Sequence, residues 1–206
     1  YTENFNTLAS NGTSNVTPVG WFFNEAGGDA LYVAGTGSAN SGGTYSFGLA
    51  ASTDRAFGSL QSGSVTPTIG ARFVNNTGGT ITRFTITYRG EQWRLGATGR
   101  TDRIDFQYRT NATGLNNGTW TDFNALDFIA PNASCSLGEL DGNLSANSSS
   151  NTNTITGLNI PNLGNFWIRW TDFNATGADD GLAIDDFEIM ASDPCNVVVS
   201  SFIPNS

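Results

Sequence analysis

Apolar and polar residues alternate with a period of two through much of the chain, and this pattern constrains the fold most strongly. Within residues 80–94, Phe84, Ile86 and Tyr88 fall on one face of an extended segment, and arginine and threonine side chains fall on the other. Successive side chains of a β-strand point to opposite faces, so such a segment has one buried face. The pattern recurs at 103–109 and 182–190. No segment has a convincing helical stripe, so we expect half-buried antiparallel strands.

Glycine- and asparagine-rich turns separate the remaining apolar segments, which makes these segments strand candidates. They are residues 19–24, 29–34, 43–50, 55–61, 66–75, 118–128, 153–160, 165–172 and 196–203. In 182–190, alternation puts Ala183, Asp185, Phe187 and Ile189 on one face, opposite Leu182, Ile184, Asp186 and Glu188. Two polar runs, 7–17 and 143–154, have little to bury, and we expect exposed loops there.

Many short strands without intervening helices are typical of a sandwich. The sequence therefore predicts an all-β fold: a two-sheet antiparallel β-sandwich of jelly-roll type over residues 1–192. Asp193-Pro194 interrupts the pattern, and 193–206 is predicted to form an extra C-terminal tail strand.

Charge and composition exclude several classes of function. The chain has 18 acidic and 9 basic residues, a net charge of −9 and no histidine, and every basic residue is arginine. Nucleic-acid binding needs a basic face, which this balance does not supply. Histidine-based catalytic or metal sites and lysine chemistry are excluded. Because no apolar run approaches the ~20 residues of a membrane span, we expect no membrane insertion. These exclusions favour a non-catalytic protein.

Export is indicated by the start at Tyr1, which suits a mature chain whose signal peptide has been removed. We therefore expect a secreted, extracellular or cell-surface protein. Cys135 and Cys195 are the two cysteines, and a disulfide between them is the prediction for an oxidising compartment. The alternative is two unrelated thiols.

Acidic residues concentrate in residues 170–187, WTDFNATGADDGLAIDDF. Calcium takes six to eight oxygen ligands, and a turn rich in Asp and Asn supplies them at short spacing. The candidate ligands for a structural calcium ion are Asp172, Asn174, Asp179, Asp180, Asp185 and Asp186. Their mutual repulsion would require a cation or Arg169 to neutralise it. The alternative is a solvated acidic loop.

Tryptophan side chains are candidates for stacking on sugar rings. We assign this role to Trp93, Trp120 and Trp167, with core packing as the alternative for each. Paired carboxylates could in principle hydrolyse glycosides, but glutamate is scarce here. Only Glu91, beside Trp93 and Arg94, is placed for such a role, and an ion pair with an arginine explains it equally well.

Five motifs together resemble a β-sandwich module of secreted bacterial multidomain proteins. They are GEQWR at 90–94, FQYRT at 106–110, GTWTDF at 118–123, LDGN at 140–143 and WIRWTDFNATGADDGLAIDDFEI at 167–189. The closing GLAIDDFEI is also similar to the end of MAM and lectin-like sandwiches, whose C-terminal acidic strand lies near an N-terminal acidic one and a calcium ion. The resemblance implies the fold and export, and it adds Glu3 as a calcium ligand beside Asp185 or Asp186.

Three functions remain after these exclusions, of which the first is favoured and the third, a glycoside hydrolase, is the most distant. The first is a structural subunit of a self-assembling surface filament or matrix, in which copies of the chain pair through an apolar terminal strand. The residues of that strand are Val197, Val198, Val199, Phe202 and Ile203. The same segment could instead be an edge strand of its own domain. The second function is a calcium-dependent carbohydrate-binding or adhesive module, with polysaccharide as its partner.

Overall fold

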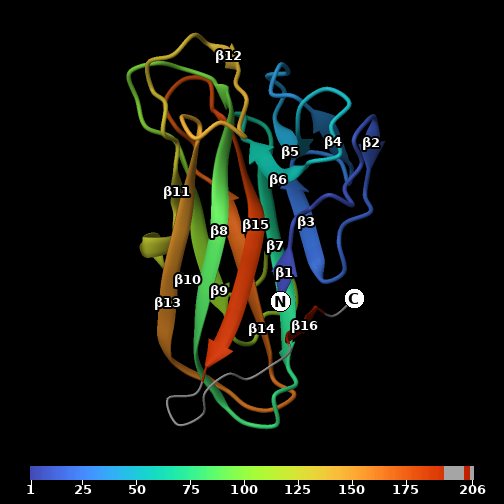
Figure 1. The fold of residues 1–206 in the computed structure, drawn as a ribbon, viewed down its shortest axis with the longest axis vertical. Coiled ribbons are helices and arrows are strands. Elements are labelled where there is room, and N and C mark those ends of the chain that lie inside the picture. The colour runs from blue at the N-terminus through green and yellow to red at the C-terminus, as the bar shows by residue number, and fades with distance from the viewer. Residues whose placement is uncertain (193–201, 205–206) are drawn as a thin grey trace.

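Two β-sheets pack face to face in the structure, a computed structural model that describes residues 1–192 and 202–204 (Figure 1). The nine-stranded sheet A has the strand order β12-β8-β15-β6-β5-β4-β2, with β1 beside β15 and β13 beside β8. The seven-stranded sheet B has the order β10-β9-β14-β7-β16, with β11 beside β9 and β3 beside β7. Every strand pair is antiparallel except β4 with β5. The prediction of an all-β antiparallel sandwich is confirmed.

The strands differ widely in length, and the longest lie in sheet A. Sheet A contains β1 (Thr2–Glu3), β2 (Thr13–Ser14), β4 (Tyr32–Gly35), β5 (Gly43–Phe47), β6 (Ala56–Leu60), β8 (Ile81–Leu95), β12 (Gly138–Glu139), β13 (Ser148–Ile160) and β15 (Gly181–Ser192). Sheet B contains β3 (Trp21–Ala26), β7 (Thr66–Asn75), β9 (Arg103–Arg109), β10 (Thr121–Asp122), β11 (Phe128–Ile129), β14 (Asn165–Asp172) and β16 (Phe202–Pro204). A short 3-10 helix, η1, spans Asn124–Leu126, and no helix among the described residues is long and apolar enough to cross a membrane.

Aromatic side chains from both sheets fill the space between them. Trp170 of β14 lies at the centre of this core, stacked on Trp21 with ring centroids 6.2 Å apart. Tyr88, Phe106 and Phe187 contact the Trp170 ring edge-on. The predicted inner face of β8, with its apolar residues at every second position, is fully buried here. Period-two alternation therefore identified the core side of the longest strand correctly.

A β-bulge in β15 changes which side chains face the core. Asp185 pairs with Arg89 of β8 and Glu188 pairs with Thr87, so β15 has one more residue than its partner across this interval. Asp186 occupies the bulge with φ of +46°. Strict alternation put Asp185 and Phe187 on the same face, and this part of the prediction was wrong, because the extra residue turns Phe187 inward while Asp185 stays outside.

The predicted polar loop at 143–154 is also wrong over much of its length, because β13 begins at Ser148. Nine consecutive residues of β13 pair with β8, from Ser148 opposite Glu91 to Thr156 opposite Arg83. Hydrogen bonds between backbones need no apolar side chains, and threonine favours strands. A polar composition therefore hid a strand whose backbone pairs with a long central neighbour.

The tail strand pairs within its own chain where the structure describes it. The backbone of β16 pairs with Phe73–Asn75 of β7, beyond the segment of β7 that pairs with β3. This is the edge-strand alternative for Phe202 and Ile203. Val197, Val198 and Val199 lie outside the described residues, and donation of this strand to a neighbouring subunit stays a prediction.

The predicted disulfide is not formed by Cys135, which is a free, exposed thiol. Cys195 lies outside the described residues. Cys135 comes just before β12, which pairs with Arg94 and Leu95 near the Gly181 end of β15. The chain leaves β15 at the opposite end, after Ser192.

Replacing Trp170 by alanine tests the proposed centre of the core. We expect Trp170→Ala to lower the free energy of unfolding by about 3–5 kcal/mol, because it leaves a large cavity where five aromatic rings meet. Phe173→Ala, at an exposed position on the same side of the sandwich, should cost about 1 kcal/mol or less. Urea unfolding measures both values, and equal losses would contradict the assignment of Trp170 to the core.

Candidate functional site

The predicted calcium ligands do not come together at one place. Asp172, Asp179 and Asp180 lie at one end of the sandwich, whereas Asp185 lies on the outer face of sheet A. Asp186 and Glu3 line a pocket on that outer face, and Asn174 is exposed in a loop. Among the described residues, no three or more acidic, histidine or cysteine side chains are grouped so that they could hold a metal ion. Calcium binding stays a prediction, without a preformed set of ligands.

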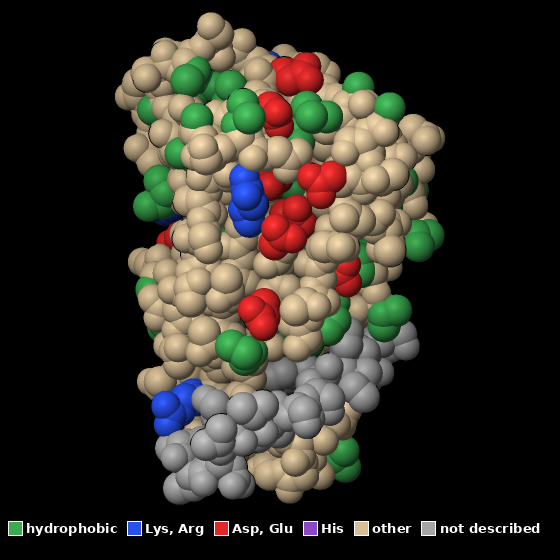
Figure 2. All heavy atoms as spheres, viewed as in Figure 1, with side chains coloured by type: hydrophobic (Ala, Val, Ile, Leu, Met, Phe, Trp, Pro, Cys, Tyr) green, Lys and Arg blue, Asp and Glu red, His purple; other side chains and the backbone are tan. Residues whose placement is uncertain are grey.

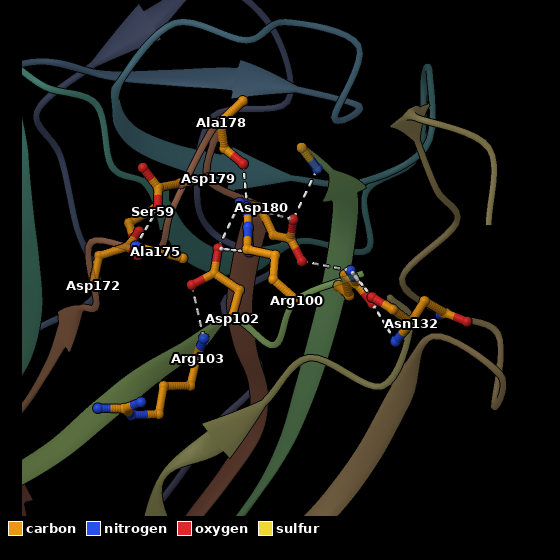
Figure 3. A network of polar contacts seen from close by, with 12 residues as sticks. Ser59, Arg100, Asp102, Arg103, Asn132, Asp172, Ala175, Ala178, Asp179 and Asp180 are labelled. Carbon is orange, nitrogen blue, oxygen red and sulfur yellow. Dashed lines mark hydrogen bonds and ion pairs between the residues drawn. The ribbon is translucent and has the colours of Figure 1, made fainter. Parts of the chain in front are cut away.

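An arginine supplies the positive charge at the end of the sandwich (Figure 3). Arg100 lies 2.9 Å from Asp102 and 3.3 Å from Asp180, measured between guanidinium nitrogen and carboxylate oxygen. The backbone N–H of Asp180 donates to Asp102 over 2.8 Å, and the backbone N–H of Gly96 and the Gln92 amide donate to Asp180. We call Arg100, Asp102 and Asp180 the Arg100 cluster. Its carboxylates are already paired with a cation of the chain itself.

Arg100 therefore supplies the neutralising charge that the sequence had suggested for Arg169. Arg169 lies on the outer face of sheet B, where it donates to Gln107 and packs over the Trp120 ring at 4.2 Å from the centroid. Asp172, near the Arg100 cluster, accepts a hydrogen bond from Ser59 over 2.8 Å. Burial raises the pKa of Asp172 well above its usual value, and the neighbouring Asp102 raises it further. A group held in its neutral form adds no repulsion to the cluster.

Two carboxylates that sequence analysis had not paired lie on the outer face of sheet A. Glu91 of β8 is 1 % exposed and Asp185 of β15 is 5 % exposed. The Trp93 indole donates to Glu91 over 3.0 Å, and the Arg89 guanidinium lies 3.2 Å from the other Glu91 oxygen. One oxygen of Asp185 has no hydrogen-bond partner. We call Glu91 and Asp185 the buried acid pair.

Burial raises the pKa of Glu91 to about 7, and the Trp93 hydrogen bond and Arg89 offset part of this shift. Burial also raises the pKa of Asp185 to about 8, where a backbone hydrogen bond opposes the shift and the charges of Glu91, Asp186 and Asp54 add to it. Each acid thus retains its proton in a pH range where an exposed carboxyl group is ionised.

Two adjoining pockets open beside the acid pair, and both include Asp186. One holds about 330 Å³ and is lined by residues 2–4 and 186–188. The other holds about 340 Å³ and is lined by Thr87, Tyr88, Arg89, Asp186 and four serines of the segment from Ser145 to Ser150. Figure 2 shows acidic side chains gathered beside a basic one on this face. We call the two pockets the Asp186 groove.

The bulge explains why the groove lies at this position. It places Asp186 in a left-handed backbone conformation, which aspartate tolerates better than most residues. The Asp186 side chain is thereby exposed between β1 on one side and β8 and β13 on the other. Asp186 and Glu3 were named from the sequence, but the four serines of the groove gave no signal, because they come from the segment predicted to be a loop.

The three tryptophans assigned to sugar stacking have different environments. Trp93 is 1 % exposed in a small apolar cluster on the outer face of sheet A, where Phe47 stacks on its ring. Trp167 is 6 % exposed on the outer face of sheet B, against Phe22. Trp120 is only partly buried. Packing therefore explains Trp93 and Trp167, and Trp120 alone of the three offers exposed ring surface.

Comparison with known proteins supports the fold. No protein-family model and no curated protein matches the sequence. Among solved structures, the K3 cleaved adhesin domain of Lys-gingipain from Porphyromonas gingivalis W83 is similar, with a TM-score of 0.50 and 13 % identity over 84 % of this chain and 91 % of that one. A CBM35 domain from Paenibacillus barcinonensis has a TM-score of 0.38 and 14 % identity over 82 % and 98 %. The likeness to the adhesin domain shows that the chain has a known β-sandwich fold.

The Arg100 cluster gives a prediction about stability. We expect Arg100→Met to lower the free energy of unfolding by about 3–5 kcal/mol, because Asp102 and Asp180 would remain buried without their cation. Arg103→Met is the matched control, since Arg103 pairs with the partly exposed Asp105. It should cost about 1 kcal/mol or less. Denaturant unfolding at neutral pH measures the difference, and a tolerated Arg100→Met would contradict the role given to Arg100.

The buried acid pair predicts that stability falls as pH rises. The folded chain keeps protons on Glu91 and Asp185 that the unfolded chain releases above pH ~4, so increasing pH favours unfolding. We expect the melting temperature to fall from about pH 5 to about pH 8, equivalent to a few kcal/mol. The double variant Glu91→Gln/Asp185→Asn should show a weaker dependence, and the raised pKa values of Asp172 and Asp180 account for what remains. A melting temperature that rises over this range, or an unchanged slope in the variant, would count against the acid pair.

Proposed function

We propose that the chain is a non-catalytic extracellular binding or adhesion module that takes a polyhydroxylated ligand, such as a polysaccharide, in the Asp186 groove. The observation that supports this most directly is the composition of the groove. Serine and threonine hydroxyls line its two pockets together with the carboxylates of Glu3, Asp186 and Glu188 and with Arg89.

This set of groups suits recognition of sugar hydroxyls. Carboxylates accept hydrogen bonds, arginine donates them, and serine and threonine do both. A sugar hydroxyl is itself both donor and acceptor, so adjacent hydroxyls can pair with this mixture. The two pockets share Asp186 and together border β1, β15, β8 and β13. Specificity would come from the few charged groups among the hydroxyls.

Binding has more support than hydrolysis at this site. A glycoside hydrolase needs two carboxyl groups that reach the scissile bond. Glu91 and Asp185 have the elevated pKa values typical of an acid catalyst, but both are almost completely buried, and Glu91 is tied to Trp93 and Arg89. Asp186, Glu3 and Glu188 are more exposed. The accessible carboxylates therefore act as hydrogen-bond acceptors in this proposal.

An adhesive function also fits the similarity to the gingipain adhesin domain, although that similarity concerns the fold. The self-assembling subunit has less support, because the described part of the terminal strand pairs with β7 of its own chain. Export to the extracellular side remains part of the proposal and rests on the sequence resemblance.

Binding to insoluble polysaccharides and to a glycan array tests the groove. We expect the wild-type chain to bind at least one glycan, and Asp186→Asn to weaken that binding at least about tenfold, since the loss of one charged hydrogen bond costs 1.4 kcal/mol or more. Asparagine tolerates the left-handed conformation at this position, so the fold should be retained. Circular dichroism spectra and melting temperatures verify this.

Two control variants locate the site. Glu139→Gln removes the same charge at an exposed position on β12 and should leave binding unchanged. Trp120→Ala removes the exposed ring of sheet B and should also leave binding unchanged. Binding that is lost in Trp120→Ala and retained in Asp186→Asn would place the glycan on sheet B. Absence of binding to every glycan would refute the carbohydrate proposal.

A further inference from the structure

We propose that strand β13 is an interface through which two copies of this chain form a symmetric dimer, by antiparallel pairing of β13 with β13 of the second copy. The inference is independent of the glycan proposal. It rests on the open edge of sheet A, on the absence of charge along that edge, and on the self-complementary sequence of Ser148–Thr156.

The first observation is that β13 has a strand on one side only. Among the described residues, β13 pairs with β8 and with no other strand, and it forms one border of sheet A (Figure 1). Its pairing with β8 runs without a register shift from Ser148 to Thr156 and becomes irregular only after Thr156. In an antiparallel ladder, every second residue of such a strand points its N–H and C=O groups away from its neighbour. About 30 Å of regular edge therefore has no strand partner, and η1 is the other element that lies close to β13.

The second observation concerns charge. No charged side chain occurs between Asp141 and Arg169, a stretch that includes the whole of β13, although the net charge of the chain is −9. Natural edge strands are usually protected from association by lysine, proline or inward-facing charges, and β13 has none of these. Two copies of an acidic chain repel each other over most of their surfaces. The uncharged edge is where a second copy can approach at the lowest electrostatic cost, which favours self-association over a basic partner.

The third observation is that Ser148–Thr156 complements itself. When a two-fold axis passes beside Thr152, Thr152 faces its own copy, Asn151 faces Asn153, and Ser150 faces Thr154. The outermost pairs are Ser149 with Ile155 and Ser148 with Thr156. Hydroxyl groups thus meet hydroxyl groups on the outer face, whereas on the inner face Asn151 meets Asn153 and Ser149 meets Ile155. No like charges become opposed, which is the usual obstacle when a strand pairs with itself.

The existing contacts of β13 show the same hydroxyl pairing. Thr154 lies 2.8 Å from Thr85 and Thr152 lies 3.0 Å from Thr87, between hydroxyl oxygens. Pairing at the open edge would extend this hydroxyl ladder across the two-fold axis. Antiparallel pairing joins the two A sheets into one continuous sheet with both outer faces on the same side. The two Asp186 grooves would then face the same surface, a geometry that increases avidity for a polymeric ligand.

Analytical ultracentrifugation over a range of protein concentrations tests the dimer. We expect wild-type chain to sediment as a monomer–dimer equilibrium, and Thr152→Lys and Thr152→Glu each to raise the dissociation constant at least about tenfold, because like charges meet at the two-fold axis. An equimolar mixture of the two variants should recover dimer, since lysine then faces glutamate. Thr152 is exposed, so neither variant should unfold the chain, and melting temperatures verify this.

Met190→Lys is the matched control, because Met190 is 54 % exposed on β15 of the same face and the charge change equals that of Thr152→Lys. It should leave the dissociation constant unchanged. A wild-type chain that remains monomeric at every concentration would overturn the proposal. A dissociation constant that is unchanged in both Thr152 variants would likewise exclude β13 as the interface. So would an equimolar mixture of the two variants that fails to recover dimer.

Discussion

The pairing of β8 with β15 is the interaction on which the rest of the structure depends. β8 is the longest strand and pairs with β12, β13 and β15, so its register sets the positions of three other strands of sheet A. One extra residue in β15 forms a bulge that interrupts the pairing of β15 with β8. Before the bulge, Asp185 faces outward beside Glu91; after it, Phe187 and Ile189 enter the core. Asp186 at the bulge thus marks the boundary between the packed interior and an accessible polar groove.

The buried acidic residues of this chain are stabilised in two different ways. At the end of the sandwich, Arg100 forms ion pairs with both Asp102 and Asp180, and burial raises the pKa of Asp180 to about 6. On the outer face of sheet A, Arg89 lies within ion-pair distance of Glu91, and raised pKa values reduce the repulsion between Glu91 and Asp185 by protonation. The raised pKa values of Glu91 and Asp185 lower the stability of the chain as the pH rises toward neutral. The more exposed carboxylates of the Asp186 groove require no such compensation for burial.

Periodicity in the sequence predicted the sandwich, the long central strands and the aromatic core, because alternation depends on local backbone geometry. It could not locate the bulge, since a single extra residue leaves the composition of GLAIDDFEI unchanged and only its partner strand reveals the shift. Arg100 could not be linked to Asp180, because long loops and strands separate them. The first residues of β13, from Ser148, were taken for a loop because their pairing relies on the backbone, whereas 153–160 was predicted as a strand. The groove combines the bulge with the hydroxyl groups of β13, so only Asp186 and Glu3 of its lining were named in advance.

The central claim is that a polyhydroxylated ligand occupies the groove at Asp186. Backbone amide chemical shifts measured during titration with an oligosaccharide test it most directly, because they report on every strand at once. We expect the largest changes at residues 2–4, 145–150 and 186–188, which line the two pockets. Changes that centre instead on Trp120 and the outer face of sheet B would contradict the claim.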